Sequence, residues 1–211
     1  MRSQPDLTVV IPTYNERDRI ETIVDEVLAS CATCRIAAEV IVVDDNSPDG
    51  TGARVDEMGR TRAVRVIHRP GKLGLGSAVL DGFAAATADV VAAIDADLSH
   101  PPRLLPVLYE ILKERDADLV VASRYVPGGG TKDWSFGRLL LSRAGCFAAR
   151  PLTPVHDPMS GFFVVRRERA LSMRTSLRGF KIGLELLVKA GARSVVEIGY
   201  VFVGRDAGGA R

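Results

Sequence analysis

The amino-acid sequence predicts an α/β fold, a mostly parallel sheet flanked by helices, in a single domain of 211 residues. Short apolar runs alternate with amphipathic segments in steps of about 25–30 residues, as expected for strands joined by right-handed helical crossovers. Polar residues directly follow the first, second, fourth and fifth of these runs. Because parallel strands end at one edge of a sheet, we expect these polar residues to lie together there, where open α/β sheets bind ligands.

The composition is that of a globular protein, with 46% hydrophobic and 26% charged residues. The net charge of +2 hides an asymmetry, because residues 1–120 carry 13 Lys and Arg against 20 Asp and Glu, and residues 121–211 carry 15 against 6. The basic half is suited to phosphate groups or an anionic membrane surface, although solvated helix faces would account equally well for several of its arginines. With 6% aromatic residues and no stacking pattern, a nucleic-acid partner is not expected.

The sequence also bears on location. No apolar run approaches the ~18–20 residues that cross a bilayer, and no signal peptide precedes the first strand. The chain has three cysteines, an odd number that gives no disulfide framework, and we expect them to be reduced in an intracellular protein. A soluble or peripheral protein is therefore expected.

The first expected strand is Leu7–Ile11, and Pro12, which has no N–H to donate, is expected to end it. Asn15 is then expected to cap a helix. Apolar residues recur at helical spacing along this segment, at Ile20, Ile23, Val24, Val27 and Leu28.

The second and third expected strands are Val40–Val43 and Ala63–His68. The second leads into residues 44–50, which are dense in turn-forming residues. The third leads into the glycine loop 71–76, whose Gly-x-x-Gly-x-Gly spacing differs from the dinucleotide-binding fingerprint. We interpret these glycines as sites of close packing, with Lys72 near a phosphate, before a helix of small residues.

The fourth expected strand, Val90–Ile94, ends in Asp95-Ala96-Asp97, and two prolines then open the next helix. Two carboxylates held this close repel each other unless a cation lies beside them. Oxygen ligands of this kind suit Mg²⁺ or Mn²⁺. A lone Asp-x-Asp is more often a pair of caps, at a strand end and a helix start, but the buried strand before it favours a metal site.

The second half begins with the strand Asp118–Ala122, which leads to Ser123-Arg124-Tyr125. A glycine-rich loop then carries Trp134 and Phe136, which we expect either to anchor the loop in the core or to touch lipid. A helix over residues 137–149 places Arg138 and Ser142 one turn apart. Arg143 is expected on a solvated helix face. Residues 156–163 form a turn into a strand that runs through Arg166, a helix begins near Phe180, and a last strand covers residues 200–203.

Several motifs together resemble the inverting family 2 glycosyltransferases of GT-A fold. They are Val-Val-Ile-Pro-Thr-Tyr-Asn-Glu (9–16), Val-Val-Asp-Asp-Asn-Ser-Pro-Asp-Gly-Thr (42–51), Gly-Leu-Gly-Ser-Ala-Val (74–79) and Asp-Ala-Asp-Leu-Ser-His-Pro-Pro (95–102). Three more narrow the resemblance to polyprenyl-phosphate sugar synthases, especially the dolichol-phosphate mannosyltransferases: Ser-Arg-Tyr (123–125), Asp-Pro-Met-Ser-Gly-Phe-Phe (157–163) and Phe-Lys-Ile-Gly-Leu-Glu (180–185). The resemblance covers nearly the whole chain.

This resemblance implies a metal-dependent transfer of mannose from GDP-mannose to dolichyl or another polyprenyl phosphate, giving a β-linked product. It implies one GT-A catalytic domain over residues 1–211, with a nucleotide-sugar and metal half (1–123) and an acceptor and membrane-facing half (124–211). The implied nucleotide-sugar residues are Pro12, Tyr14, Glu16, Val43, Asp44, Asp95, Ala96, Asp97, Lys181 and Arg205. The implied metal ligands are Asp95, Asp97 and Ser99. At position 99, some relatives carry Gln in place of Ser. The implied acceptor-phosphate residues are Arg124, Arg138 and Ser142, and the catalytic residues are Asp95, Asp97 and Arg124.

The expected chemistry agrees with these residues. A phosphate monoester has a second pKa of about 6 and is largely a dianion near neutral pH, so no strong general base is needed. Arginines grip such a phosphate bidentately and aim it at the anomeric carbon. A UDP-glucose or other nucleotide-sugar donor with the same lipid phosphate is the alternative, and a nucleotide-binding module without turnover is a third possibility that the intact Asp pair disfavours.

The resemblance also implies partners and a location. We expect the protein to act at the cytoplasmic face of a membrane, at the endoplasmic reticulum in a eukaryote or the plasma membrane in a prokaryote. A membrane surface and a small membrane-anchoring subunit are the expected partners, since many relatives continue into transmembrane helices where this sequence stops.

Overall fold

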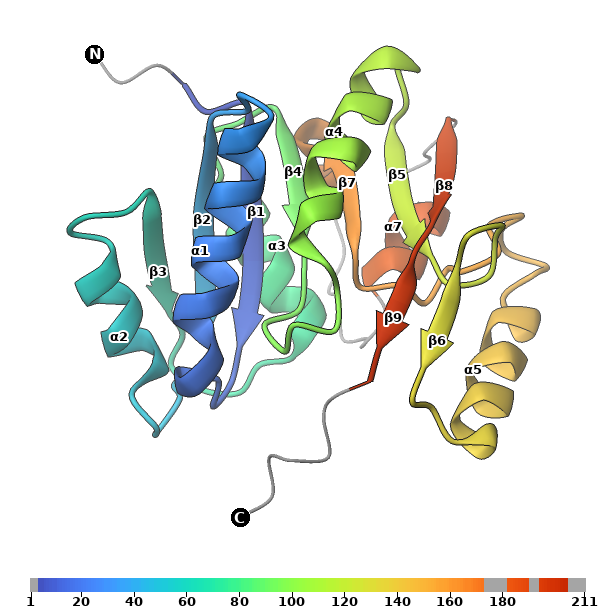
Figure 1. Cartoon of the computed structure of the whole chain (residues 1–211), viewed down its shortest axis with the longest axis horizontal. Helices are drawn as coiled ribbons and strands as arrows, with labels where there is room; N and C mark the ends of the chain where they lie inside the picture. The colour runs from blue at the N-terminus through green and yellow to red at the C-terminus, as the bar shows by residue number, and fades with distance from the viewer. Residues whose placement is uncertain (1–3, 173–181, 190–193, 205–211) are drawn as a thin grey trace.

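The computed structural model describes residues 4–172, 182–189 and 194–204 and contains the predicted sheet (Figure 1). Seven strands lie in the order β3-β2-β1-β4-β7-β5-β8. Their bounds are β1 Leu7–Thr13, β2 Ala38–Asp44, β3 Val64–His68, β4 Val90–Ala93, β5 Leu119–Ser123, β7 Phe163–Arg166 and β8 Val195–Gly199. All pairings are parallel except those of β7, which runs antiparallel to β4 and β5, so the predicted fold class is confirmed.

Helices cover both faces of this sheet (Figure 1). One face carries α1 (Arg17–Thr33), α2 (Thr51–Met58) and α4 (Leu105–Glu114), which follows a short 3₁₀ turn at Pro102–Leu104. The other face carries α3 (Leu75–Ala85), α6 (Arg167–Leu171) and α7 (Ile182–Lys189). Buried apolar side chains fill both interfaces, as expected for a three-layer α/β domain.

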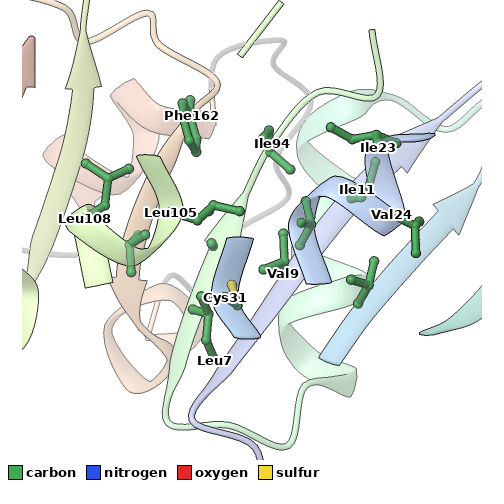
Figure 2. Close-up of a cluster of buried hydrophobic side chains, with 14 of the residues drawn as sticks. Leu7, Val9, Ile11, Ile23, Val24, Cys31, Ile94, Leu105, Leu108 and Phe162 are labelled. Atoms are coloured by element: carbon green, nitrogen blue, oxygen red, sulfur yellow. The ribbon is translucent and has the colours of Figure 1, made fainter. Parts of the chain in front are cut away.

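The period-two geometry of the central strand β1 divides its side chains between these two layers. Leu7, Val9 and Ile11 pack with α1 and α4 in the larger core cluster (Figure 2), whereas Val10 packs with α3. Because β1 is buried on both faces, its apolar run is continuous rather than alternating.

A second, smaller unit stands beside the main sheet (Figure 1). It consists of β6 (Gly130–Lys132) and β9 (Val201–Val203), which pair in parallel, and of α5 (Phe136–Ala148). The sequence did not reveal β6, which lies in a glycine-rich stretch, and it did not reveal β8 either. Among the residues of α5, Cys146 alone is buried.

Two local predictions were wrong. Pro12 does not end β1 but lies within it, opposite Val43. The backbone of Pro12 faces the same side as that of Val10, whose carbonyl accepts from the Ile94 N–H at 3.2 Å on the β4 side. Because β4 pairs with β1 only as far as Val10, no hydrogen bond of the sheet requires an N–H at Pro12. Asn15 adopts the left-handed conformation (φ 59°) that asparagine tolerates, and it is not the helix cap.

The start of α1 is instead held by the turn after β2. The N-cap position belongs to Glu16, whose N–H donates to Thr51 Oγ1 at 3.0 Å, and the Arg17 N–H donates to Asp49 Oδ2 at 3.1 Å. Within the described ranges, none of the helices is both long enough and apolar enough to span a bilayer.

Candidate active site

Asp95 and Asp97 lie just beyond the end of β4, where two cavities meet. Both carboxylate residues line a cavity of about 320 Å³ next to β1 and a second of about 730 Å³ next to α5, here called the β1 cavity and the inner α5 cavity. Leu98 has a left-handed backbone (φ 61°) that turns the chain sharply, and the Ser99 N–H donates to Asp97 Oδ1 at 3.0 Å. This turn fixes the direction of the Asp97 carboxylate.

Six residues assigned to the nucleotide-sugar site from the sequence line the β1 cavity: Pro12, Tyr14, Glu16, Asp95, Ala96 and Asp97. Six others that the sequence did not assign to this site share it: Thr13, Asp45, Lys72, Gly74, Leu75 and Ala78. The Lys72 ammonium lies 4.1 Å from the centroid of the Tyr14 ring, a cation–π contact between the glycine loop and the end of β1. The expectation that Lys72 stands near a phosphate is therefore compatible with its position.

Asp44 and Val43 are not among the residues that line the β1 cavity. Val43 is packed in the core beside α3, and Asp44 is buried, where it accepts from Thr13 Oγ1 at 3.1 Å and from Ser47 N at 3.0 Å. Its neighbour Asp45 reaches the cavity instead, held by an ion pair with Arg69 at 2.7 Å. The sequence could not decide between the two acids, because a shift of one residue in the strand end exchanges their directions.

The inner α5 cavity contains the three residues expected to hold the acceptor phosphate: Arg124, Arg138 and Ser142. The helix α5 begins one residue before its predicted start, with Ser135 as N-cap accepting from Arg138 N at 3.3 Å. Arg138 and Ser142 therefore lie one turn apart on the wall of the cavity that also contains both aspartates.

Arg124 is paired with a buried carboxylate. Its Nε and Nη2 atoms donate to the two oxygens of Asp157, each at 2.7 Å, and its backbone N–H donates to the same carboxylate at 2.9 Å. The side chains are 9% and 0% exposed. Burial disfavours the charged guanidinium, but the hydrogen bonds and charge of Asp157 outweigh it and raise the pKa of Arg124. The pair stays ionised, and Asp157 neutralises most of the charge that Arg124 presents to the cavity.

A hydrogen-bonded chain supports Asp95 from behind. His100 Nε2 lies 3.1 Å from Asp95 Oδ2, and His100 Nδ1 lies 2.8 Å from the Tyr200 hydroxyl. Burial raises the pKa of Tyr200, against a smaller opposing effect of Arg124, so the phenol remains protonated and can donate to Nδ1. In the tautomer that accepts from Tyr200 at Nδ1, the Nε2–H of His100 donates to Asp95. His100 is thus held on both sides and positions the Asp95 carboxylate.

An aromatic cluster connects this chain to the acceptor side. His100 packs against Phe202 (ring centroids 5.3 Å apart), Phe202 packs against Trp134 (5.3 Å), and the Arg138 guanidinium lies 4.3 Å from the Trp134 ring centroid. We call this series from Asp95 to Arg138 the aromatic bridge. Trp134 is thus partly buried against the core, whereas Phe136 is 80% exposed, so the two aromatic residues paired in the sequence have different environments.

The remaining predicted residues are placed as follows. Ser99 is buried and is absent from the linings of both cavities. Lys181 and Arg205 lie outside the described residues. Among the described residues, no three His, Cys, Asp or Glu side chains form a metal-binding cluster. Asp95 and Asp97 are two oxygen donors facing open space, which fits Mg²⁺ or Mn²⁺ because these ions keep positions for water and phosphate oxygens.

Comparisons with known proteins show which family and which solved structures the chain is similar to. Residues 8–171 match the model of glycosyl transferase family 2. The chain is 39% identical over 200 residues to a dolichol-phosphate mannosyltransferase of Pyrococcus furiosus, covering 93% of this chain and 56% of that protein. It is 39% identical over 212 residues to the polyprenol monophosphomannose synthase of Mycolicibacterium smegmatis, covering 95% and 78%. The chain thus spans little more than half the length of the Pyrococcus relative.

Among solved structures, the chain resembles glucosyl-3-phosphoglycerate synthase of Mycobacterium tuberculosis, crystallised with Mn²⁺, UDP and glucosyl-3-phosphoglycerate. The TM-score is 0.69 at 25% identity, covering 98% of this chain and 73% of that one. Another crystal structure of the same enzyme contains Mg²⁺ and UDP.

Proposed function

Because the chain belongs to glycosyl transferase family 2, we propose that it transfers mannose from GDP-mannose to dolichyl or another polyprenyl phosphate. The observation that carries this proposal is the meeting of two cavities at Asp95 and Asp97, with arginines in only one of them. The names of the relatives from Pyrococcus and Mycolicibacterium support mannose as the sugar and a polyprenyl phosphate as its acceptor.

The β1 cavity is the proposed donor site. Tyr14 offers a ring face, and Lys72 offers a charge for the diphosphate. Asp95 and Asp97 would hold the divalent ion, which when bound offsets the charge of the diphosphate leaving group. Asp44 would support the donor site indirectly, because it does not line the cavity and instead accepts hydrogen bonds from Thr13 and Ser47.

The inner α5 cavity is the proposed acceptor site. The phosphate monoester is already anionic near neutral pH, so positioning rather than proton removal is the main task of the protein. Arg138 and Ser142 would bind the phosphate oxygens from one turn of α5. Arg124 would contribute less attraction than a free arginine, because Asp157 shares its charge. Attack from this side, opposite the leaving diphosphate, would invert the anomeric carbon and give a β-linked product.

We further propose that the protein works at the cytoplasmic face of a membrane, with a small membrane-anchoring subunit as partner. Support comes from α5, whose large apolar residues Phe136, Leu141 and Phe147 are 80%, 76% and 78% exposed. A polyprenyl tail leaves the bilayer only at a cost of about 0.8 kcal/mol per CH₂, so the enzyme must meet the phosphate at the interface.

A UDP-sugar is the second candidate donor, because a solved structure of similar fold, glucosyl-3-phosphoglycerate synthase, was crystallised with UDP. The relatives named as mannosyl enzymes are more similar in sequence to this chain, at 39% against 25% identity, and this favours mannose as the sugar. The test is a side-by-side assay of GDP-mannose and UDP-glucose with a polyprenyl phosphate in detergent, with product anomericity read by NMR. Turnover with UDP-glucose alone would overturn the proposed donor.

A further inference from the structure

A third cavity lies on the other side of α5 and has no part in the proposed reaction. Its volume is about 430 Å³, and we call it the outer α5 cavity. The residues that matter in its lining are Arg124, Tyr125, Arg143, Phe147, Arg150 and His156. Arg124 and Tyr125 form the partition from the inner cavity, since Arg124 lines both and the Tyr125 hydroxyl donates to Ser142 Oγ at 2.7 Å.

The helix presents a different set of side chains to each cavity. Arg138, Ser142 and Gly145 line the inner cavity, at positions i, i+4 and i+7. Arg143 and Phe147 lie four residues apart on α5 and line the outer cavity, and Arg150, two residues past the end of the helix, lines it too. The expectation that Arg143 only decorates a solvated helix face is therefore incomplete, because this exposed residue also forms part of a cavity wall.

The charges around the outer α5 cavity are unevenly compensated. Arg124 is paired with Asp157, and the His156 ring lies 2.8 Å from Glu197 Oε2. In the part of the chain that the structure describes, neither Arg143 nor Arg150 has a carboxylate within salt-bridge distance.

The contacts of these two arginines leave them able to bind a ligand. Arg150 donates to the Pro154 carbonyl at 3.1 Å, and the Arg143 guanidinium lies 6.0 Å from the Tyr125 ring centroid. Two uncompensated guanidinium groups on one cavity attract an anion, and their planar forks match phosphate oxygens.

An exposed apolar stripe of α5 reaches this cavity at Phe147. Phe147 lines the cavity while 78% of it is exposed, and Phe136 and Leu140, which do not line it, lie on the same stripe of α5. Basic residues beside exposed apolar side chains are characteristic of helices that lie in a membrane interface. A soluble anion would gain nothing from such a stripe, whereas a lipid would place its phosphate in the cavity and its chains beyond Phe147.

We propose that the outer α5 cavity binds the phosphate of an anionic lipid headgroup, as a docking site separate from the acceptor phosphate. The bound lipid does not react. It would hold α5 against the membrane, so that the inner cavity opens toward the interface from which the acceptor comes.

The test measures binding rather than turnover, so its result is independent of the proposed mannosyl transfer. The full chain is sedimented with phosphatidylcholine vesicles containing or lacking phosphatidic acid. Replacing both arginines by lysine (Arg143→Lys with Arg150→Lys) keeps the charge but removes the bidentate forks. We expect this variant to bind phosphatidic acid vesicles about 10-fold more weakly, with an unchanged melting temperature. The matched control, Arg60→Lys with Arg115→Lys, changes two exposed arginines that follow α2 and α4 and line neither of the α5 cavities, and it should bind like the wild type.

Two results would overturn the proposal. Equal binding by the Arg143→Lys/Arg150→Lys variant and the wild type would mean that only diffuse charge attracts the membrane. Saturable binding of inorganic phosphate in calorimetry, lost in that variant, together with no gain from phosphatidic acid in the vesicles, would assign the cavity to free phosphate instead.

Discussion

The helices α1 and α5 have comparable lengths but opposite relations to the rest of the molecule. Of its 17 residues, α1 buries five apolar side chains against the sheet, whereas α5 buries only Cys146 of its 13. The apolar residues of α1 therefore build the core, and those of α5 are available to something outside the folded chain. Apolar spacing alone therefore does not distinguish a helix that packs in the core from one that leaves its apolar side chains exposed.

The largest expected effect concerns the buried ion pair between Arg124 and Asp157. Asp157→Ala leaves the Arg124 guanidinium buried without its partner, and we expect the free energy of unfolding to fall by about 3–5 kcal/mol. Urea denaturation measures this loss. The double variant Arg124→Met/Asp157→Asn removes both charges, and the amide oxygen at position 157 still accepts from the backbone N–H of position 124. This double variant should be more stable than Asp157→Ala. If both variants lost the same free energy of unfolding, the unpaired charge of Arg124 would not be the cause of the instability.

The comparison itself is tested by truncating one apolar residue in each helix. Ile23→Ala in α1 leaves a cavity in the core and should cost about 2–5 kcal/mol. Leu140→Ala in α5 removes a side chain that is 58% exposed and should change stability by no more than about 0.5 kcal/mol. Denaturation midpoints of the two variants would decide this. A comparable loss in both would mean that α5 packs as tightly as α1 in solution.

The next prediction concerns the carboxylates that both cavities share. Asp97→Ala should lower turnover at least ~10²-fold, as for the loss of a preorganised charge stabiliser. Chelation by EDTA should abolish turnover, and Mg²⁺ or Mn²⁺ should restore it. Because Asp97 is half-buried and accepts from the Ser99 N–H, the free energy of unfolding should fall by about 1 kcal/mol, which leaves the variant folded. Full activity of this variant would remove Asp97 from the metal site.

The smallest expected effect separates the two cavities from each other. Arg138→Ala should raise the KM for the lipid phosphate about 10-fold, because it removes one charge-assisted contact, and leave the affinity for GDP-mannose nearly unchanged. Calorimetry with GDP-mannose and kinetics with the acceptor give the two numbers. Loss of donor binding with intact acceptor kinetics would mean that the two sites are wrongly divided.

The sequence predicted the main sheet well because its strands are buried on both faces and read as continuous apolar runs. Asp95, Asp97, Arg138 and Ser142 do line cavities, since strand ends and helix spacing determine those positions, and their roles in metal and phosphate binding stay predictions. It could not reveal the partner of Arg124, because Asp157 is 33 residues away and meets it only through the pairing of β5 with β7. The burial of Trp134 depends on Phe202 from β9, a contact equally invisible to local patterns.

The aromatic bridge has a thermodynamic consequence for the order in which substrates bind. A single stack of rings supports both Asp95, at the donor side, and Arg138, at the acceptor side. If the proposed donor ordered Asp95, the stack would also order part of the surroundings of Arg138 before the lipid arrives. Linkage would then require reciprocity: the factor by which GDP-mannose raised affinity for the lipid phosphate would equal the factor by which the lipid phosphate raised affinity for GDP-mannose. Shortening Phe202, which also lines the inner α5 cavity, would bring that common factor toward one.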